Sequence, residues 1–152
     1  MRIAGIASAV WTRRNVMVPC CALMLYLLML VISTHVPPAG LRPFQFSRQF
    51  KLPDKLAHAT AYGGLTLLVM AVWRIRRPVK MGVKQKCIGL AGLCVLIACW
   101  GLMDEFTQPY FGRNFDWLDW MANLTGMSLA VTLSAIIPST ARAWWLTAFS
   151  LR

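Results

Sequence analysis

The sequence predicts an all-α integral membrane protein, a four-helix bundle in which neighbouring spans run antiparallel. Hydrophobic residues make up 58% of the 152-residue chain and charged residues only 14%, and the mean hydropathy is +0.56. Soluble domains carry about 25% charged residues. Four segments are apolar over the roughly 20 residues that a helix needs to cross a bilayer core. The composition therefore excludes an ordinary soluble domain and favours a single membrane domain.

Each of the four predicted spans is bounded by polar or helix-breaking residues. The first begins after Arg13 and Arg14 and stops before Pro37. Its apolar run is too long for a signal peptide and no small-residue cleavage site follows it, so we expect it to be retained. The second opens with a polar turn. The predicted spans are Val16–Val36, Asp54–Trp73, Cys87–Phe106 and Trp117–Ile137.

The distribution of basic residues predicts the direction of the spans. Eleven Lys and Arg residues lie before the first span, between the second and third, or after the fourth, against five at the opposite membrane surface. Cytoplasmic loops carry the excess of positive charge, so both termini are expected in the cytoplasm, with the protein in the cell (inner) membrane. The predicted organisation is a cytoplasmic N-terminal segment (1–15), a four-span domain (16–137) and an interfacial C-terminal tail (138–152).

The net charge of +11 is explained by these loops and by anionic lipid headgroups, so no nucleic-acid partner is predicted. The five cysteines lie in apolar segments without a C-x-x-C pair, which indicates neither disulfides nor a zinc site. No cofactor motif is present, and the preferred interpretation includes neither a cofactor nor a metal. The oligomeric state is left open.

All five acidic residues are expected at the same membrane surface, because the first and third connections both face away from the cytoplasm. A carboxylate within the bilayer costs roughly 2.5–3.5 kcal/mol on insertion scales, so such groups persist where something pairs or uses them. The functional site is therefore predicted here. The acids are Asp54, Asp104, Glu105, Asp116 and Asp119.

The start of the second span places polar residues on one helix face. Asp54, His58 and Tyr62 are spaced i, i+4, i+8 and stack along that face. Asp54 alone is equally well explained as a helix cap. For His58, a core histidine bonded to the backbone and a functional histidine are both consistent with the sequence.

The start of the fourth span has a similar pattern. Asp116 and Asp119 resemble a capping box with Asp in place of Glu, and capping alone could explain both acids. Asn123 and Gly126 continue the same face. An Asn within a span typically bonds to a neighbouring helix, and a Gly lets that helix come close.

Asp104 and Glu105 have no such explanation, because they lie near the C-terminal end of the third span, where the helix dipole disfavours acids. Three explanations remain open: Arg113 pairs with one acid, a cation is bound, or one carboxyl is protonated. Gln108 lies one turn beyond Asp104 on the same face, and the helix is expected to end at Pro109. Arg113, held on a turn by Gly112, could reach either an acid or an incoming phosphate.

These motifs together resemble the VanZ-like family of small bacterial membrane proteins. The resemblance covers four spans in the right order, and one departure is Ala130, where the family tends to have a second glycine. It implies a four-helix membrane protein and, from the founding member, reduced susceptibility to teicoplanin, an antibiotic-resistance role. It also implies that the motif residues form the site. The candidate ligand-binding residues are Asp54, Lys55, His58, Tyr62, Asp104, Glu105, Gln108, Arg113, Asp116, Asp119 and Asn123.

The favoured function is non-enzymatic binding of an amphiphilic cell-envelope ligand, either a membrane lipid or a lipid-linked molecule. Lys55, His58 and Arg113 would receive an anionic head. The alternative is a membrane-embedded, divalent-metal-dependent hydrolase or transferase acting on a phosphoester lipid, with His58 and the acids Asp104, Glu105 and Asp119 as ligands. No recognisable catalytic motif supports it. Transport is disfavoured because the ionisable groups lie at one rim only.

Overall fold

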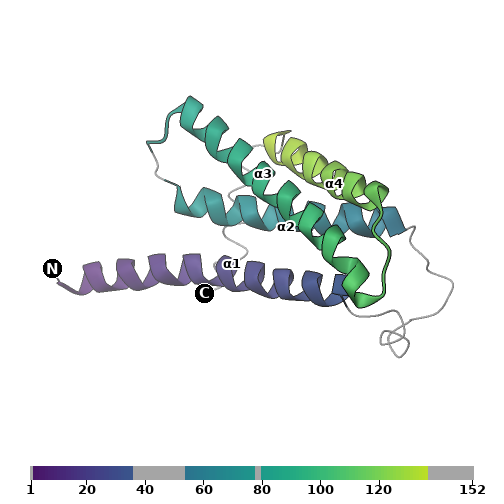
Figure 1. Ribbon diagram of the computed structural model, residues 1–152. Coiled ribbons are helices and arrows are strands. Elements are labelled where there is room, and N and C mark those ends of the chain that lie inside the picture. The colour runs from purple at the N-terminus through teal and green to yellow at the C-terminus, as the bar shows by residue number, and fades with distance from the viewer. Residues whose placement is uncertain (1, 36–53, 78–79, 137–152) are drawn as a thin grey trace.

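The computed structural model describes residues 2–35, 54–77 and 80–136, with side chains from residue 17 onward. It is all-α, as predicted, and contains no strand in the residues that it describes (Figure 1). The predicted tail at 138–152 lies outside the described residues. The elements are α1 (Arg2–His35), α2 (Asp54–Arg76), α3 (Val83–Thr107), the 3-10 helix η2 (Gln108–Phe111) and α4 (Trp117–Ile136).

The helix bounds extend the predicted spans rather than replace them. α1 begins at Arg2, so residues 2–15 continue the first helix. Three segments are long and apolar enough to cross a membrane: Met17–His35, Asp54–Arg76 and Val83–Phe111. α4, which is 20 residues long, is not among these three, and its buried residues include the polar Asp119 and Asn123. That α4 crosses the membrane therefore stays a prediction.

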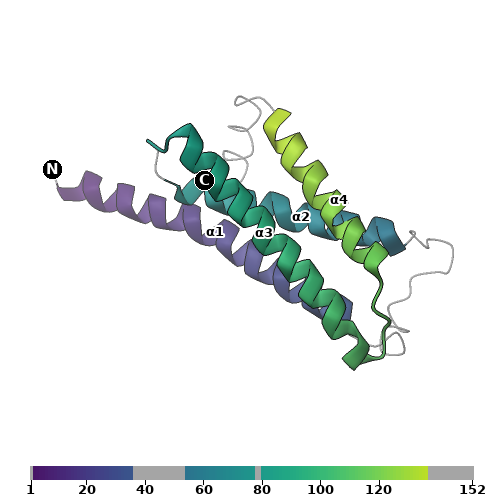
Figure 2. The same ribbon diagram turned by 45° about the horizontal axis from the view of Figure 1, so that its top comes forward.

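Consecutive helices run in opposite directions, which is the predicted antiparallel arrangement. In Figures 1 and 2 the end of α1, the start of α2, the end of α3 and the start of α4 all lie at the same end of the bundle, on the right. We call this the polar end. It brings together the two acidic regions that are far apart in the sequence, as the prediction required.

α2 is the central helix and packs against α1, α3 and α4. The apolar core between these helices contains Leu30, Tyr62, Leu65 and Ile97, all nearly inaccessible to solvent. The Tyr26 hydroxyl donates a 2.7 Å hydrogen bond to the carbonyl of Ala61 and fixes α1 against α2. Tyr62 belongs to this core, and its hydroxyl reaches Asp104, so the polar end is directly adjacent to the apolar core.

α2 and α4 approach each other at backbone distance. A Cβ atom at Gly126 would lie 1.9 Å from the carbonyl oxygen of Ala59, so only glycine fits this position. The predicted role of Gly126 in close packing is thus confirmed. Ala130, the departure from the family pattern, is also buried, with 3% of its surface exposed. Alanine there is compatible with the close contact.

Candidate functional site

The first turn of α4 is fixed by Asp116. Its Oδ1 accepts a 2.8 Å hydrogen bond from the Leu118 N–H, and its carbonyl accepts from the Asp119 N–H at 3.1 Å. Asp116 is therefore the N-cap of α4. The predicted capping box is only half present, because the Asp119 side chain is buried and turns to α2 instead of back to Asp116.

Lys55 links the starts of α2 and α4. Its ammonium donates to Asp116 Oδ2 and to Asp119 Oδ1, and its side chain is 41% exposed. Hydrogen bonds from Lys55 and from the Leu118 N–H hold the pKa of Asp116 below its ordinary value. The lysine is thus oriented by two carboxylates and lies at the edge of the site, where solvent reaches it.

His58 lies one turn further along α2 than Lys55, and its side chain is buried against α3 and α4. Its Nδ1 is 3.1 Å from Asn123 Oδ1 and 3.6 Å from Glu105 Oε1, and its Nε2 is 3.7 Å from Asp119 Oδ2. The ring therefore has a polar partner at each nitrogen, and the predicted link from Asn123 to a neighbouring helix is present. A histidine bonded only to the backbone does not describe this position.

Asp104 is buried and well satisfied. Its Oδ1 accepts a 2.8 Å hydrogen bond from the Thr34 hydroxyl and its Oδ2 a 3.3 Å bond from the Tyr62 hydroxyl. His35 Nδ1 lies 3.7 Å from the same Oδ1. Two hydroxyl donors and a histidine thus compensate a carboxylate at the disfavoured end of α3.

Glu105, one residue further, has the opposite environment. It is 0% exposed, and neither of its carboxylate oxygens has a hydrogen-bond partner among the described residues. The backbone N–H of Asp116 lies near this carboxylate but outside hydrogen-bond geometry. The side-chain nitrogens of Gln108 and Asn123 are likewise buried without a partner within the described chain. Unpaired buried polar groups cost roughly 1–3 kcal/mol each, and more when charged.

Arg113 does not make the contact that was considered for it. Its Nη1 donates a 3.2 Å hydrogen bond to the carbonyl of Ser33 on α1, and it pairs with no acid in the residues described. Gly112, with a positive φ of 74°, ends η2 just before it, as predicted. α3 itself stops at Thr107, directly before η2. Pairing of Arg113 with Asp104 or Glu105 is therefore wrong, because the turn directs the guanidinium to α1.

α1 contributes to the site, which was not predicted. Thr34 bonds to Asp104, and His35 Nε2 lies 2.8 Å from the Thr107 hydroxyl. The polar triplet Ser33, Thr34 and His35 at the end of an apolar span was the signal that could have found them. The polar end thus takes side chains from all four helices.

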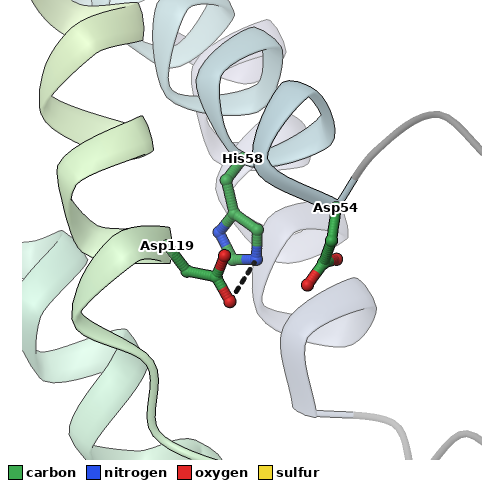
Figure 3. Close-up of side chains that lie close together, drawn as sticks. All are labelled: Asp54, His58 and Asp119. Carbon is green, nitrogen blue, oxygen red and sulfur yellow. Dashed lines mark ion pairs between the residues drawn. The ribbon is translucent and has the colours of Figure 1, made fainter.

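Three of these residues form a group with the composition of a metal site. Asp54, His58 and Asp119 each offer one ligand atom, and these atoms lie within 4.8 Å of one another (Figure 3). Asp54 is exposed, whereas His58 and Asp119 are buried. In the view of Figure 3 the imidazole ring lies between the two carboxylates, and the dashed line joins its Nε2 to Asp119. This group differs from the metal ligands considered in the sequence analysis, because it contains Asp54 and lacks Asp104 and Glu105.

Taken together, the candidate residues cluster at one end of the bundle, with Tyr62 where the cluster meets the apolar core and Arg113 at its margin. The fold and this cluster define a class: a helical membrane-type protein with ionisable side chains buried at one end of an apolar bundle. The chain belongs to the VanZ/LLP1 family, whose pattern matches residues 16–138. Searches of curated proteins and of solved structures gave no significant match.

Proposed function

We propose that this protein binds an amphiphilic cell-envelope ligand at its polar end without transforming it. The observation that supports this most is the contrast between the apolar sides of the bundle and its polar end. Large apolar side chains are exposed along α1 and α3, including Met24, Leu28 and Leu96, while charged and amide groups gather at one end. A molecule with a polar head and a lipid tail matches both surfaces at once.

The head group would be anionic and would contact Lys55 and Arg113. Lys55 is held at the rim by Asp116 and Asp119, so it is positioned before any ligand arrives. Arg113 uses one of its five N–H donors on Ser33, as far as the described residues extend. The remaining donors suit the paired oxygens of a phosphate or carboxylate.

The tail would lie beside an aromatic border next to Arg113. Tyr110 is 86% exposed and Phe111 43% exposed, directly before the Gly112 turn. Phe106, Phe115 and Trp117 form a neighbouring chain of ring contacts with centroids 4.8–6.4 Å apart. Aromatic side chains of this kind favour the boundary between headgroups and hydrocarbon.

The proposal includes an orientation and a biological setting. With both termini in the cytoplasm, the polar end faces outward from the inner membrane of a bacterial cell, where envelope precursors and lipid-tailed glycopeptides are found. Binding of a teicoplanin-type molecule there would reduce the amount free to act, which is the resistance role that the family resemblance implies.

The test is native mass spectrometry of the protein released gently from its own membrane. The wild-type protein should retain a lipid or lipid-linked mass, and Arg113→Ala should lose it. Arg77→Ala is the matched control, because Arg77 stacks on Trp73 (5.1 Å to the ring centroid) near the opposite end of α2. Equal retention by the Arg113→Ala and Arg77→Ala proteins would contradict the proposal.

A second candidate function is the metal-dependent hydrolase or transferase of phosphoester lipids. The specific observation in its favour is the grouping of Asp54, His58 and Asp119. A water molecule activated by a divalent ion would attack phosphorus and displace the lipid alcohol. Phosphate or alcohol release from a phosphoester lipid, dependent on added Mn²⁺ and absent in Asp54→Asn, would favour this candidate over simple binding.

A further inference from the structure

We propose that Asp54, His58 and Asp119 bind one divalent transition-metal ion of the Mn²⁺ type. The site goes beyond the lipid-binding function and does not depend on it. It would open to water through Asp54, which is exposed, while His58 and Asp119 form its buried wall. The occupant is identified by its ligands: two carboxylates and one imidazole suit Mn²⁺ and related borderline-hard ions.

The separation of the three ligand atoms is close to what a single ion needs. Two bonds of about 2.1 Å place ligand atoms at most about 4.2 Å apart, against an observed upper separation of 4.8 Å. Closing that gap requires a shift of roughly half an ångström. Asp54 can supply this shift, because it is exposed at the first position of α2.

Asp119 has an oxygen available for the ion. Lys55 takes Oδ1, whereas Oδ2 faces His58 Nε2 at 3.7 Å. The two oxygens therefore divide between the ammonium and the proposed metal. Lys55 would hold the carboxylate in orientation, a role typical of the groups that surround metal ligands.

The surroundings of His58 point independently to a cation at Nε2. A metal-bound histidine almost always donates its other ring N–H to a carboxylate or carbonyl oxygen. His58 Nδ1 lies 3.1 Å from Asn123 Oδ1 and 3.6 Å from Glu105 Oε1, which leaves the Nε2 lone pair for a metal.

Glu105 supplies the second, separate observation. It is 0% exposed, its Oε1 is directed at the His58 ring, and neither oxygen has a hydrogen-bond partner in the described part of the chain. A buried carboxylate that accepts no hydrogen bond needs nearby positive charge. A divalent ion on the far side of the imidazole supplies it and strengthens the Nδ1–H as a donor. A metal ion bound by Asp54, His58 and Asp119 would therefore also explain why Glu105 is buried beside His58.

The experiment is a titration of the purified, metal-free full-length protein in detergent with MnCl₂, followed by electron paramagnetic resonance. We expect one tightly bound Mn²⁺ per chain, with a pulsed-resonance coupling to an imidazole nitrogen and displacement by Zn²⁺. Asp54→Asn should weaken binding by at least the tenfold, order-of-magnitude loss that a supporting residue produces. Glu105→Gln should weaken it by roughly 10–100-fold, as a residue behind the histidine.

Asp116→Asn is the matched control. It removes the same charge from the same end of the bundle. Asp116 is no ligand of the proposed ion, although it shares Lys55 with Asp119, so binding should weaken less than in Asp54→Asn. Asn caps a helix as well as Asp does, so α4 should remain intact. Asp54→Asn is equally safe for folding because Asp54 is exposed, and His58→Gln adds a variant in which the nitrogen coupling itself must vanish.

Equal weakening by Asp54→Asn and Asp116→Asn would overturn the proposal, because it would show only diffuse attraction to an acidic surface. Absence of nitrogen coupling in the wild-type protein would overturn it as well. The lipid-binding function fails separately, through unchanged lipid retention in Arg113→Ala. A metal-binding protein that retains no lipid, or the reverse, would therefore show which of the two inferences is wrong.

Discussion

Gly126→Ala is the substitution that most directly tests the contact on which the site depends. The new Cβ would lie 1.9 Å from the Ala59 carbonyl oxygen and 2.6 Å from its carbonyl carbon, both backbone atoms that no side-chain rotation can move. α2 and α4 must therefore separate. Overpacking costs about 1–3 kcal/mol, and a backbone clash of this size belongs near the top of that range.

The expected net effect is smaller than the clash alone. Replacing Gly by Ala in a helix returns about 1 kcal/mol in helix propensity, which leaves a loss of about 2 kcal/mol. In a chain of this length, that corresponds to a fall of about 4–8 °C in the unfolding midpoint. Separation of the helices should also lengthen the 3.1 Å contact of His58 with Asn123, three residues before Gly126.

Gly92→Ala is the matched control, since a Cβ at Gly92 would meet no atom within 4 Å. It should gain helix propensity without strain and leave the midpoint equal or slightly higher. The assay is a thermal melt in detergent, read by intrinsic tryptophan fluorescence. If Gly126→Ala melts at or above the wild-type temperature, the close contact between α2 and α4 is refuted.

The remaining predictions concern the acids and the orientation. Asp104→Asn should lower the free energy of unfolding by about 2–3 kcal/mol, because Thr34 and Tyr62 lose a charged acceptor. Glu105→Gln should not lower the free energy of unfolding of the metal-free protein, since it removes a buried charge that accepts no hydrogen bond in the described chain; a loss as large as that of Asp104→Asn would contradict this. The pKa of Asp116 is lowered by Lys55, so its contribution to stability is present above the unfolded value of about 4 and is lost as pH falls through the lower folded value. The melting temperature of Asp116→Asn should therefore fall less than that of the wild type on acidification from about pH 6 to about pH 3. A fluorescent reporter that matures only in the cytoplasm should be active when fused to the C-terminus, and a dark fusion would reverse the predicted orientation.

The fold could be predicted because each of its signals is local. Hydropathy over about 20 residues defines a helix of spanning length, and the bounds of α2 and α4 begin at the predicted residues. The first span was predicted from Val16 and the apolar segment begins at Met17, whereas α1 itself begins at Arg2, because a change in hydropathy marks the membrane and not the end of the helix. That α4 crosses the membrane stays a prediction, since the three described segments that are long and apolar enough to span do not include it.

The site could be predicted only as far as single helix faces reach. The i, i+4 spacing placed His58 and Tyr62 on one buried face, and the same rule grouped Asp119 with Asn123. Which atoms then meet across helices depends on the rotation of each helix about its axis, which spacing does not specify. For that reason the sequence left several partners open for Arg113, which lies against Ser33 of α1, and the α1 donor Thr34 was overlooked.

We propose above that the polar end receives the head of an envelope ligand. The most direct test of this proposal is crosslinking of a photoactivatable anionic phospholipid in membranes, with the modified peptides mapped by mass spectrometry. Crosslinks should concentrate at residues 106–118 and at the start of α2, and they should be lost in Arg113→Ala. Crosslinks spread evenly along the apolar faces and unchanged in that variant would contradict it.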